Sequence, residues 1–405
     1  MTSPFIQFRW LLDSYQQAME NGWTDDEFVS LVTRLDEAVA DVAGHGFEPT
    51  PLVHPQSLVD GLGLRTARMW VKDDTGNVGG SHKSRHLFGT MLHLAVEGRQ
   101  DGELAIASCG NAAVAAAVVA KAVDRPLRVF IPSWADEPTV EILRSLDARI
   151  EVCERLPGEV GDPAYLTFLG AVQRGAVPFS VQGSVTLSAL DGGRTLGWEL
   201  ATQLGLAQVE GRIRLFVQVG GGALASAVWQ GLSEGIHEQW LLADPVLHAV
   251  QTEACAPLVR AWDRLTVEIA ERHELILPAT RPMRAEALLL EDPEFIDDAL
   301  DIAGEHQDRF MWPWEAVGHS AASGILDDVT YDWRTVVEPM LRSGGWPIVV
   351  TEAMVHRAHE IGTSLTGIDA SATGTAGLAG LLDTTTTDQI RPEDTVVVLF
   401  TGIER

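Results

Sequence analysis

One lysine of the sequence follows two glycines, in the stretch Asn77-Val78-Gly79-Gly80-Ser81-His82-Lys83, where a loop is expected to enter a helix. Glycines let the backbone approach a bound molecule closely, and the first turn of a helix has free N–H groups. The positive end of a helix disfavours an ammonium group, so we expect the pKa of Lys83 to be lowered, as a lysine that forms a Schiff base requires. The alternative is an ordinary exposed lysine in a flexible loop, because short motifs also occur by chance.

A second polar turn, Ser108-Cys109-Gly110-Asn111-Ala112, lies between an expected strand and an alanine-rich helix. The hydroxyl of Ser108, the amide of Asn111 and the free backbone N–H groups of the turn would together bind a carboxylate. Alternatively, Asn111 only caps the helix. No histidine lies at a spacing that would activate Cys109 as a nucleophile, so we interpret it as a small buried residue.

Three consecutive glycines open another expected helix, in the stretch Gly220-Gly221-Gly222-Ala223-Leu224. The N–H groups of such a turn form a phosphate-binding nest. A nicotinamide-binding dehydrogenase is an alternative, because Gly220, Gly222 and Ala225 also satisfy the Rossmann pattern G-x-G-x-x-A and Glu253 ends the next expected strand. Glu253 comes later than the usual spacing of about 20 residues, and this alternative leaves the lysine loop and the Asn111 turn without a use.

A hydroxyl group follows the last expected strand, in the dipeptide Thr401-Gly402. The apolar run from Val396 to Phe400 precedes it, so we expect Thr401 to lie inside the core. A hydroxyl there usually just ends a strand, and alone it does not indicate a site.

Strands and helices that alternate along the chain must position these groups. Apolar or β-branched runs predict strands over 68–72, 104–108, 127–131, 149–153, 215–219, 246–252 and 395–400. Helical spacing predicts helices over 84–97, 112–123, 139–146 and 223–233, and two more within 11–42, the second capped by Thr24 with Glu27 three positions on. This alternation predicts an α/β fold with mostly parallel sheets covered by helices on both faces. Residues 255–345 show the least regular pattern.

Composition and charge exclude several classes of protein. Acidic residues outnumber basic ones by 57 to 29 in the 405-residue chain, a formal net charge of −28. Such a surface repels phosphate backbones and anionic lipids, so we expect neither nucleic acid nor membrane partners. The scattered Cys109, Cys153 and Cys255 argue against a disulfide framework or a thiolate metal site. The first ten residues lack the apolar segment of a signal peptide, so we expect a cytoplasmic protein.

Taken in chain order, the four motifs resemble those of the fold-type-II pyridoxal-phosphate-dependent enzymes, the tryptophan synthase β-like superfamily, from Thr50 to the C-terminus. The lysine loop resembles the family's N-P-x-G-S-F-K, which implies that Lys83 binds pyridoxal 5'-phosphate. The turn resembles S-x-G-N, which implies that Asn111 contacts the phenolic oxygen of the cofactor. The residues from Ser108 to Ala112 would then bind the substrate carboxylate.

The other two motifs carry the same resemblance. Gly220 to Leu224 resembles the phosphate loop G-G-G-G-L. Thr401-Gly402 resembles the L-T-G end of threonine synthases, which implies that Thr401 meets the pyridine nitrogen.

Some positions depart from the family pattern. Val78 replaces a proline and Ala223 replaces a fourth glycine, and the backbone should tolerate both changes. His82 replaces phenylalanine, as in tryptophan synthase β chains, but Ile106 stands where those enzymes have a catalytic glutamate, so tryptophan synthesis is not expected. The stretch from Ser320 to Ile325 and the residues from Gly110 to Ala113 are most similar to threonine synthase-like members.

The resemblance implies two open three-layer α/β/α domains with the cofactor in the cleft between them, and a homodimer. We expect a large cofactor-binding domain of residues 1–90 and 190–405, and a smaller mobile domain of residues 91–189 that carries the carboxylate turn. The expected activity is that of a lyase or synthase, β-elimination or β/γ-replacement on an amino acid, as in threonine synthases and serine-threonine dehydratases. A non-catalytic relative that only binds the cofactor remains an alternative.

Overall fold

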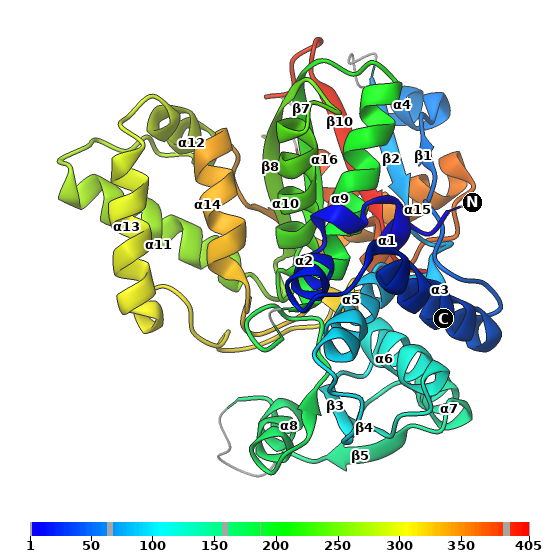
Figure 1. Cartoon of the computed structure of the whole chain (residues 1–405). Coiled ribbons are helices and arrows are strands. Elements are labelled where there is room, and N and C mark those ends of the chain that lie inside the picture. Colours follow the sequence, from blue (N-terminus) through cyan, green and yellow to red (C-terminus); the bar gives the residue numbers. More distant parts are fainter. Residues whose placement is uncertain (1, 63–67, 156–160, 187, 384–388, 405) are drawn as a thin grey trace. The chain divides into compact units, whose positions relative to one another are not determined.

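Helices alternate with strands through most of the computed structural model, which describes residues 2–62, 68–155, 161–186, 188–383 and 389–404 (Figure 1). The chain divides into two compact units. Unit 1 comprises residues 1–50 and 76–199, and unit 2 comprises residues 51–75 and 200–404. Among the described residues, no helix is long and apolar enough to cross a membrane.

Unit 2 is built on a six-stranded sheet in the order β1-β2-β10-β7-β8-β9. Its strands are β1 (Leu52–Val53), β2 (Met69–Asp73), β7 (Gly211–Gln218), β8 (Ala243–Thr252), β9 (Ile348–Val350) and β10 (Thr395–Phe400). Only β1 runs antiparallel to its neighbour. All six residues of β10 are buried, because a central strand of a parallel sheet is covered on both faces, which explains its unbroken apolar run.

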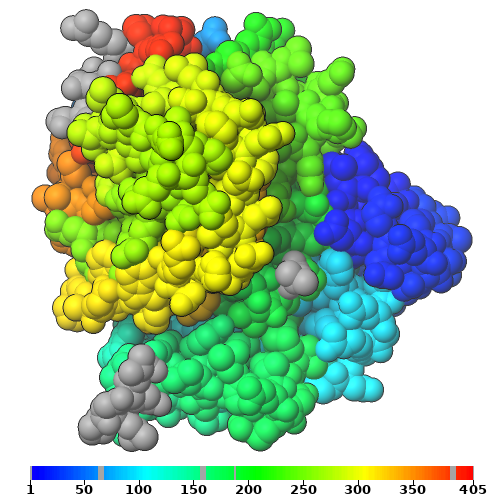
Figure 2. All heavy atoms as spheres, turned by 90° about the vertical axis from the view of Figure 1, so that its left-hand side faces the viewer, coloured from blue at the N-terminus to red at the C-terminus, as the bar shows by residue number. Residues whose placement is uncertain are grey.

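Helices cover both faces of this sheet, with α10 (Ala223–His237) on one side and α16 (Ala372–Leu381) on the other (Figure 1). The remaining helices of unit 2 are α4 (Gln56–Leu62), α11 (Pro257–Arg272), α12 (Arg281–Leu289), α13 (Glu294–Glu305), α14 (Trp333–Ser343) and α15 (Glu352–Thr366), with short 3-10 turns at Gln307–Arg309 and Ser323–Ile325. Helices α11, α12 and α13 pack with α14, which lies against β8. The yellow-green and yellow residues of α11 to α13 cover much of the face of unit 2 that Figure 2 shows. These helices occupy the region whose sequence pattern was least regular.

Unit 1 contains a four-stranded, wholly parallel sheet in the order β5-β4-β3-β6. Its strands are β3 (Leu104–Ala107), β4 (Leu127–Pro132), β5 (Arg149–Cys153) and β6 (Val177–Pro178). Helices α6 (Asn111–Ala122), α7 (Glu137–Ser145) and α8 (Pro163–Gln173) connect the strands. Helices α6 and α8 both pack on β3 and β4, so this sheet is also covered on both faces and the expected α/β class is confirmed.

The other helices of unit 1 come before β3 or after β6 in the sequence, and α3 and α5 among them pack on α6. They are α1 (Pro4–Gln7), a 3-10 turn (Arg9–Leu11), α2 (Asp13–Glu20), α3 (Asp25–Ala43), the 3-10 turn η2 (Val78–Gly80), α5 (Lys83–Val96) and the first part of α9 (Ser188–Leu206). The capping box expected at Thr24 is confirmed, since Thr24 Oγ1 accepts from the N–H of Glu27 and the Glu27 carboxylate accepts from the N–H of Thr24. Phe5, Phe47 and Phe88 form an aromatic cluster that joins α1 to α5.

The compact units differ from the expected domain boundaries. Residues 1–50, 76–90 and 190–199 were expected in the large domain, but they lie in unit 1 with residues 91–189. The reason is that α2 packs on α5, while α3 and α5 pack on α6. The expectation that residues 91–189 form a mobile domain concerns a movement, which a single structure does not test. The domain assignment therefore stays a prediction.

Candidate active site

Lys83 is the first residue of α5 and is half-buried. The chain has only three lysines, so few amines could hold an aldehyde cofactor. Lys72 is fully buried in β2, where its Nζ donates to Gln203 Oε1 at 2.9 Å. Lys121 lies at the end of α6 in a half-exposed ion pair with Asp147. Lys83 alone of the three follows a glycine turn at a helix start.

The turn before Lys83 depends on its glycines. Gly79 and Gly80 have φ values of 64° and 70°, the left-handed region that side chains disfavour. A Cβ added at Gly79 would also lie 3.2 Å from Ser84 Oγ. The expectation that a loop with two glycines enters a helix at the lysine is therefore confirmed.

A buried ion pair anchors α5 two residues after Lys83. Arg85 Nη1 donates to Glu199 Oε1 of α9 at 2.5 Å, and both side chains are 1% exposed. The Glu199 carboxylate also accepts from the N–H and the hydroxyl of Thr50, at 3.0 and 3.2 Å. Because every oxygen of this carboxylate has donors, the pair fixes the start of α5 against α9.

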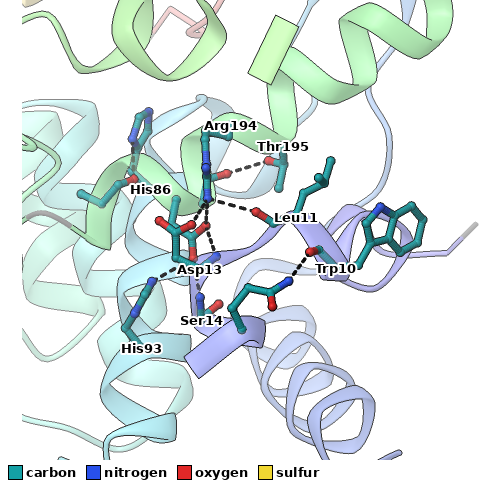
Figure 3. Close-up of polar contacts among 12 residues, drawn as sticks. Trp10, Leu11, Asp13, Ser14, His86, His93, Arg194 and Thr195 are labelled. Atoms are coloured by element: carbon teal, nitrogen blue, oxygen red, sulfur yellow. Dashed lines mark hydrogen bonds and ion pairs between the residues drawn. The ribbon is translucent and has the colours of Figure 1, made fainter. Parts of the chain in front are cut away.

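A second ionic cluster anchors the other end of α5 (Figure 3). His93 Nε2 lies 2.8 Å from Asp191 Oδ2, and Arg194 Nη2 donates to Asp191 Oδ1 at 2.6 Å and to Asp13 Oδ1 at 2.7 Å. The Asp191 carboxylate also accepts from the N–H groups of Asp13 and Ser14, at 2.9 and 3.1 Å, and so caps α2. Burial raises the pKa of Asp191, but the hydrogen bond from His93 and the charge of Arg194 outweigh it and the pKa is lowered.

Helices α5 and α9 touch through their backbones between these two clusters. A Cβ added at Gly89 would lie 2.5 Å from Gly192 Cα, and one added at Gly192 would overlap the carbonyl oxygen of Arg85. The glycines let the two helices approach closely enough for the ion pairs at both ends to form.

His86, one turn after Lys83, is neutral. Burial, and to a smaller extent the positive charges of Lys83 and Arg85, lower its pKa to about 3 against the opposing effect of a backbone hydrogen bond. That bond runs from Nδ1–H to the carbonyl oxygen of Ala189, 2.9 Å away. The residue therefore adds no positive charge beside the lysine.

The turn from Ser108 to Ala112 joins β3 to α6, as expected. Gly110 occupies the N-cap position, and Asn111 is the first helical residue, so the alternative that Asn111 caps α6 is wrong. The expectation of a buried Cys109 is also wrong: it is half-buried, because it lies in the turn beyond the end of the strand. Ser108 Oγ accepts from the N–H of Gly110 at a long 3.4 Å.

The glycines Gly220, Gly221 and Gly222 join β7 to α10, whose first two residues, Ala223 and Leu224, are buried. Gly222 has a φ of 104° at the N-cap, and no side chain caps the helix there. A Cβ at Gly222 would lie 3.1 Å from Asp332 Cβ, and a Cβ at Gly220 would lie 2.9 Å from Ile325 Cα. The N–H of Asp332 donates to the Gly221 carbonyl oxygen at 2.8 Å, which holds the shape of the turn.

Thr401 lies directly after β10 and is buried, as expected. Its Oγ1 accepts a hydrogen bond of 2.6 Å from Nε2 of Gln218, the last residue of β7. Gln218 also belongs to the segment that leads into Gly220. Sequence reasoning missed it, although an amide at the end of the apolar run before three glycines was a visible signal.

Polar atoms of the lysine loop fit a site that a bound group completes. Asn77 Nδ2 donates to the Ser81 carbonyl oxygen at 2.9 Å. Asn77 Oδ1 and Ser81 Oγ are buried and have no hydrogen-bond partner among the described residues. Buried polar atoms are normally paired, so these two atoms fit a polar group that is bound beside the lysine loop. In unit 2, the backbone N–H groups of the glycine turn before α10 fit a phosphate group.

The predicted site residues fall into two groups, one in each compact unit. Unit 1 holds Lys83 and the turn from Ser108 to Ala112, and its helices α5 and α6 pack together. Unit 2 holds the turn from Gly220 to Leu224 and Thr401, which Gln218 connects. The individual roles of these residues stay predictions.

Comparisons with known proteins show the family and the fold of the chain. The family model described as pyridoxal-phosphate dependent enzyme matches residues 44–402. No curated protein sequence matches the chain. The processed form of threonine deaminase isoform 2 from Solanum lycopersicum has a similar structure, with a TM-score of 0.61 and 17% identity over 95% of this chain and 91% of that chain.

Two other solved structures are also similar. Diaminopropionate ammonia lyase from Escherichia coli has a TM-score of 0.63 and 16% identity, over 93% of this chain and 89% of that chain. Maize serine racemase has a TM-score of 0.60 and 17% identity, over 92% of each chain. At these identities the similarity shows the shared fold and not a shared reaction.

Proposed function

The chain belongs to the fold-type-II pyridoxal-phosphate-dependent enzymes, and we propose that it is a lyase or synthase that acts on an amino acid with a leaving group on its side chain. The reaction would be β-elimination, or β- or γ-replacement, as in serine-threonine dehydratases and threonine synthases. The observation that carries this proposal is Thr401, a buried hydroxyl held by an uncharged amide at the position where the resemblance places the pyridine nitrogen.

The residues of both units would have distinct roles. Lys83 would hold the cofactor and, once released, take the proton from the substrate's α-carbon with its Nζ. Gly220 to Leu224 would bind the phosphate, and the turn from Ser108 to Ala112 would bind the substrate carboxylate, with Asn111 on the phenolic oxygen. When bound, the cofactor supplies an electron sink for negative charge at the α-carbon.

Thr401 favours elimination or replacement over amino transfer. A carboxylate beside the pyridine nitrogen would keep that nitrogen protonated and make the ring a strong electron sink, which suits transamination and racemisation. A hydroxyl is not charged and offers only a hydrogen bond, so the nitrogen should stay neutral. Negative charge at the α-carbon is then relieved by loss of the side-chain substituent, and we expect negligible amino transfer to keto acids.

The lysine assignment is tested by borohydride reduction of the holoenzyme, which makes a lysine-bound cofactor permanent. Peptide mass mapping has only three lysines to distinguish, and the label should lie on Lys83. Lys121→Ala is the matched control, because Lys121 is exposed and paired with Asp147; it should label as the unmodified protein does. A label on Lys72, or on no lysine, would contradict the assignment.

The reaction is tested by supplying serine, threonine, O-acetylserine, O-phosphohomoserine and diaminopropionate in turn. Release of ammonia with a keto acid indicates elimination, and a second amino-acid product indicates replacement. Chiral analysis of recovered serine distinguishes racemisation. Cofactor binding without turnover of any of these would favour a non-catalytic relative, and efficient amino transfer would refute the argument from Thr401.

The carboxylate turn is tested separately with Asn111→Ala. This variant should retain the cofactor, change its spectrum and bind the amino acid more weakly, by about 1.5–3 kcal/mol for the loss of one charge-assisted hydrogen bond. An unchanged substrate titration would exclude this role for Asn111.

A further inference from the structure

We infer that Gln218 is a positioning residue that polarises the Thr401 hydroxyl toward donating its hydrogen and so keeps the cofactor's ring nitrogen unprotonated. This inference rests on the proposed function, since it concerns the partner of that nitrogen. It is based on the buried hydrogen bond of 2.6 Å that Gln218 Nε2 donates to Thr401 Oγ1.

The surroundings of Gln218 determine which way its amide points. Nε2 faces two carbonyl oxygens, that of Gly374 at 3.1 Å and that of Leu399 at 3.4 Å. The amide oxygen Oε1 lies near the α-carbon of Gly377, since a Cβ added to this glycine would lie 2.8 Å from it. No described residue donates a hydrogen bond to Gln218 Oε1. A flipped amide would bring its oxygen against both carbonyl oxygens, so the amide nitrogen must face Thr401.

The geometry of the sheet holds the two side chains in this relation. Strands β7 and β10 are parallel neighbours, with Val398 opposite Phe216. Continuing this register places the end of β7 at Gln218 beside the end of β10 at Phe400, one residue before Thr401. Gln218 and Thr401 are 3% exposed, so water does not compete for their hydrogen bond.

The hydrogen bond from Gln218 affects whether the Thr401 hydroxyl donates to an aromatic nitrogen or accepts from it. A hydroxyl that accepts a hydrogen bond becomes a stronger donor, because hydrogen bonds in a chain polarise one another. The positive end of the amide N–H also disfavours a second, cationic donor at the same oxygen. An unprotonated nitrogen, which accepts, is therefore favoured over a protonated nitrogen, which donates.

One charged residue could oppose this effect. Asp74 follows β2, the other neighbour of β10, and its backbone N–H donates to the Phe400 carbonyl oxygen at 2.8 Å. The Asp74 side chain is fully buried. A carboxylate close to the ring nitrogen would favour protonation, so the experiment must separate Asp74 from Gln218.

The experiment is nitrogen NMR of the substrate-free holoenzyme, reconstituted with cofactor that carries ¹⁵N in its pyridine ring. In the unmodified protein we expect the chemical shift of an unprotonated ring nitrogen near neutral pH, with protonation only on acidification. In Gln218→Met, loss of the polarising hydrogen bond should move ring protonation to a pH about one unit higher, about tenfold in the equilibrium. Thr401→Val removes the partner itself and should respond no further to Gln218→Met.

Gln251→Met is the matched control. Gln251 is a fully buried amide near the end of β8 that donates to the Val219 carbonyl oxygen at 3.2 Å and accepts from the N–H of Leu258 at 2.9 Å. Its loss should lower stability as Gln218→Met does but leave ring protonation unchanged.

Two results would overturn the inference. One is a protonated ring nitrogen in the unmodified holoenzyme that Asp74→Asn deprotonates, which would assign control to Asp74. The other is Gln218→Met with the same protonation as the unmodified protein. Since no substrate is present, neither result depends on the reaction catalysed; failure of the proposed function shows instead as no label on Lys83 or no elimination or replacement. If Gln218→Met does not fold, the unmodified protein and Thr401→Val still decide whether Thr401 acts as a donor.

Discussion

Removal of the carboxylate that anchors the start of α5 should destabilise the protein strongly. Glu199→Met leaves the Arg85 guanidinium buried, 1% exposed, without its partner at 2.5 Å, and takes an acceptor from the N–H of Thr50. Breaking a buried ion pair by removing one partner costs about 3–5 kcal/mol, a shift of more than about a hundredfold in the folding equilibrium. The double variant Arg85→Met with Glu199→Met should recover much of this loss, because it leaves no unpaired buried charge.

The assay is chemical denaturation of the holoenzyme followed by tryptophan fluorescence, for which the fully buried Trp198 lies next to Glu199. Glu137→Met is the control, since Glu137 and Arg144 form an ion pair of 2.7 Å with side chains 65% and 61% exposed. Exposed pairs contribute about 0–1 kcal/mol. If Glu199→Met costs no more than Glu137→Met, the argument that this pair anchors α5 is refuted.

Three further changes test other parts of the structure. Gly192→Ala should destabilise the protein, because the added methyl group would overlap the Arg85 carbonyl oxygen; a denaturation midpoint equal to that of the unmodified protein would contradict the close helix contact. Asp191 has a lowered pKa in the folded protein, so its stabilising effect is present above the ordinary value near 3.8 and is lost as the pH falls through the lowered value. Asp191→Asn should therefore be less stable near neutral pH and lose less stability on acidification, as denaturation at several pH values would show. Burial, with nearby aspartates, raises the pKa of Cys255 to about 12, so iodoacetamide near pH 8 should alkylate the half-buried Cys109 first, and mass mapping that found Cys255 labelled first would contradict this.

Much of the fold follows from local patterns. The apolar run of β10, the capping box at Thr24 and the left-handed Gly79 and Gly80 were predictable, because strand burial, helix capping and glycine turns depend on a few consecutive residues. Each of the four motifs is likewise a short run of consecutive residues, and for this reason they indicated the class of cofactor from the sequence alone. Helices α11 to α13 were not predicted, although α11 and α13 bury one face against each other and against α14 and therefore carry the spacing of amphipathic helices.

What the sequence alone left open depends on which elements become neighbours. The contact of Gly89 with Gly192 and the pair of Arg85 with Glu199 join residues more than about a hundred positions apart. No local pattern places these residues together, because the approach of α5 and α9 is decided by packing over the whole of unit 1. The hydrogen bond from Gln218 to Thr401 likewise exists only because the sheet order makes β7 and β10 neighbours. The sequence therefore determined which chemical groups the protein carries, and the tertiary structure decided which partners hold them and in which direction their hydrogen bonds run.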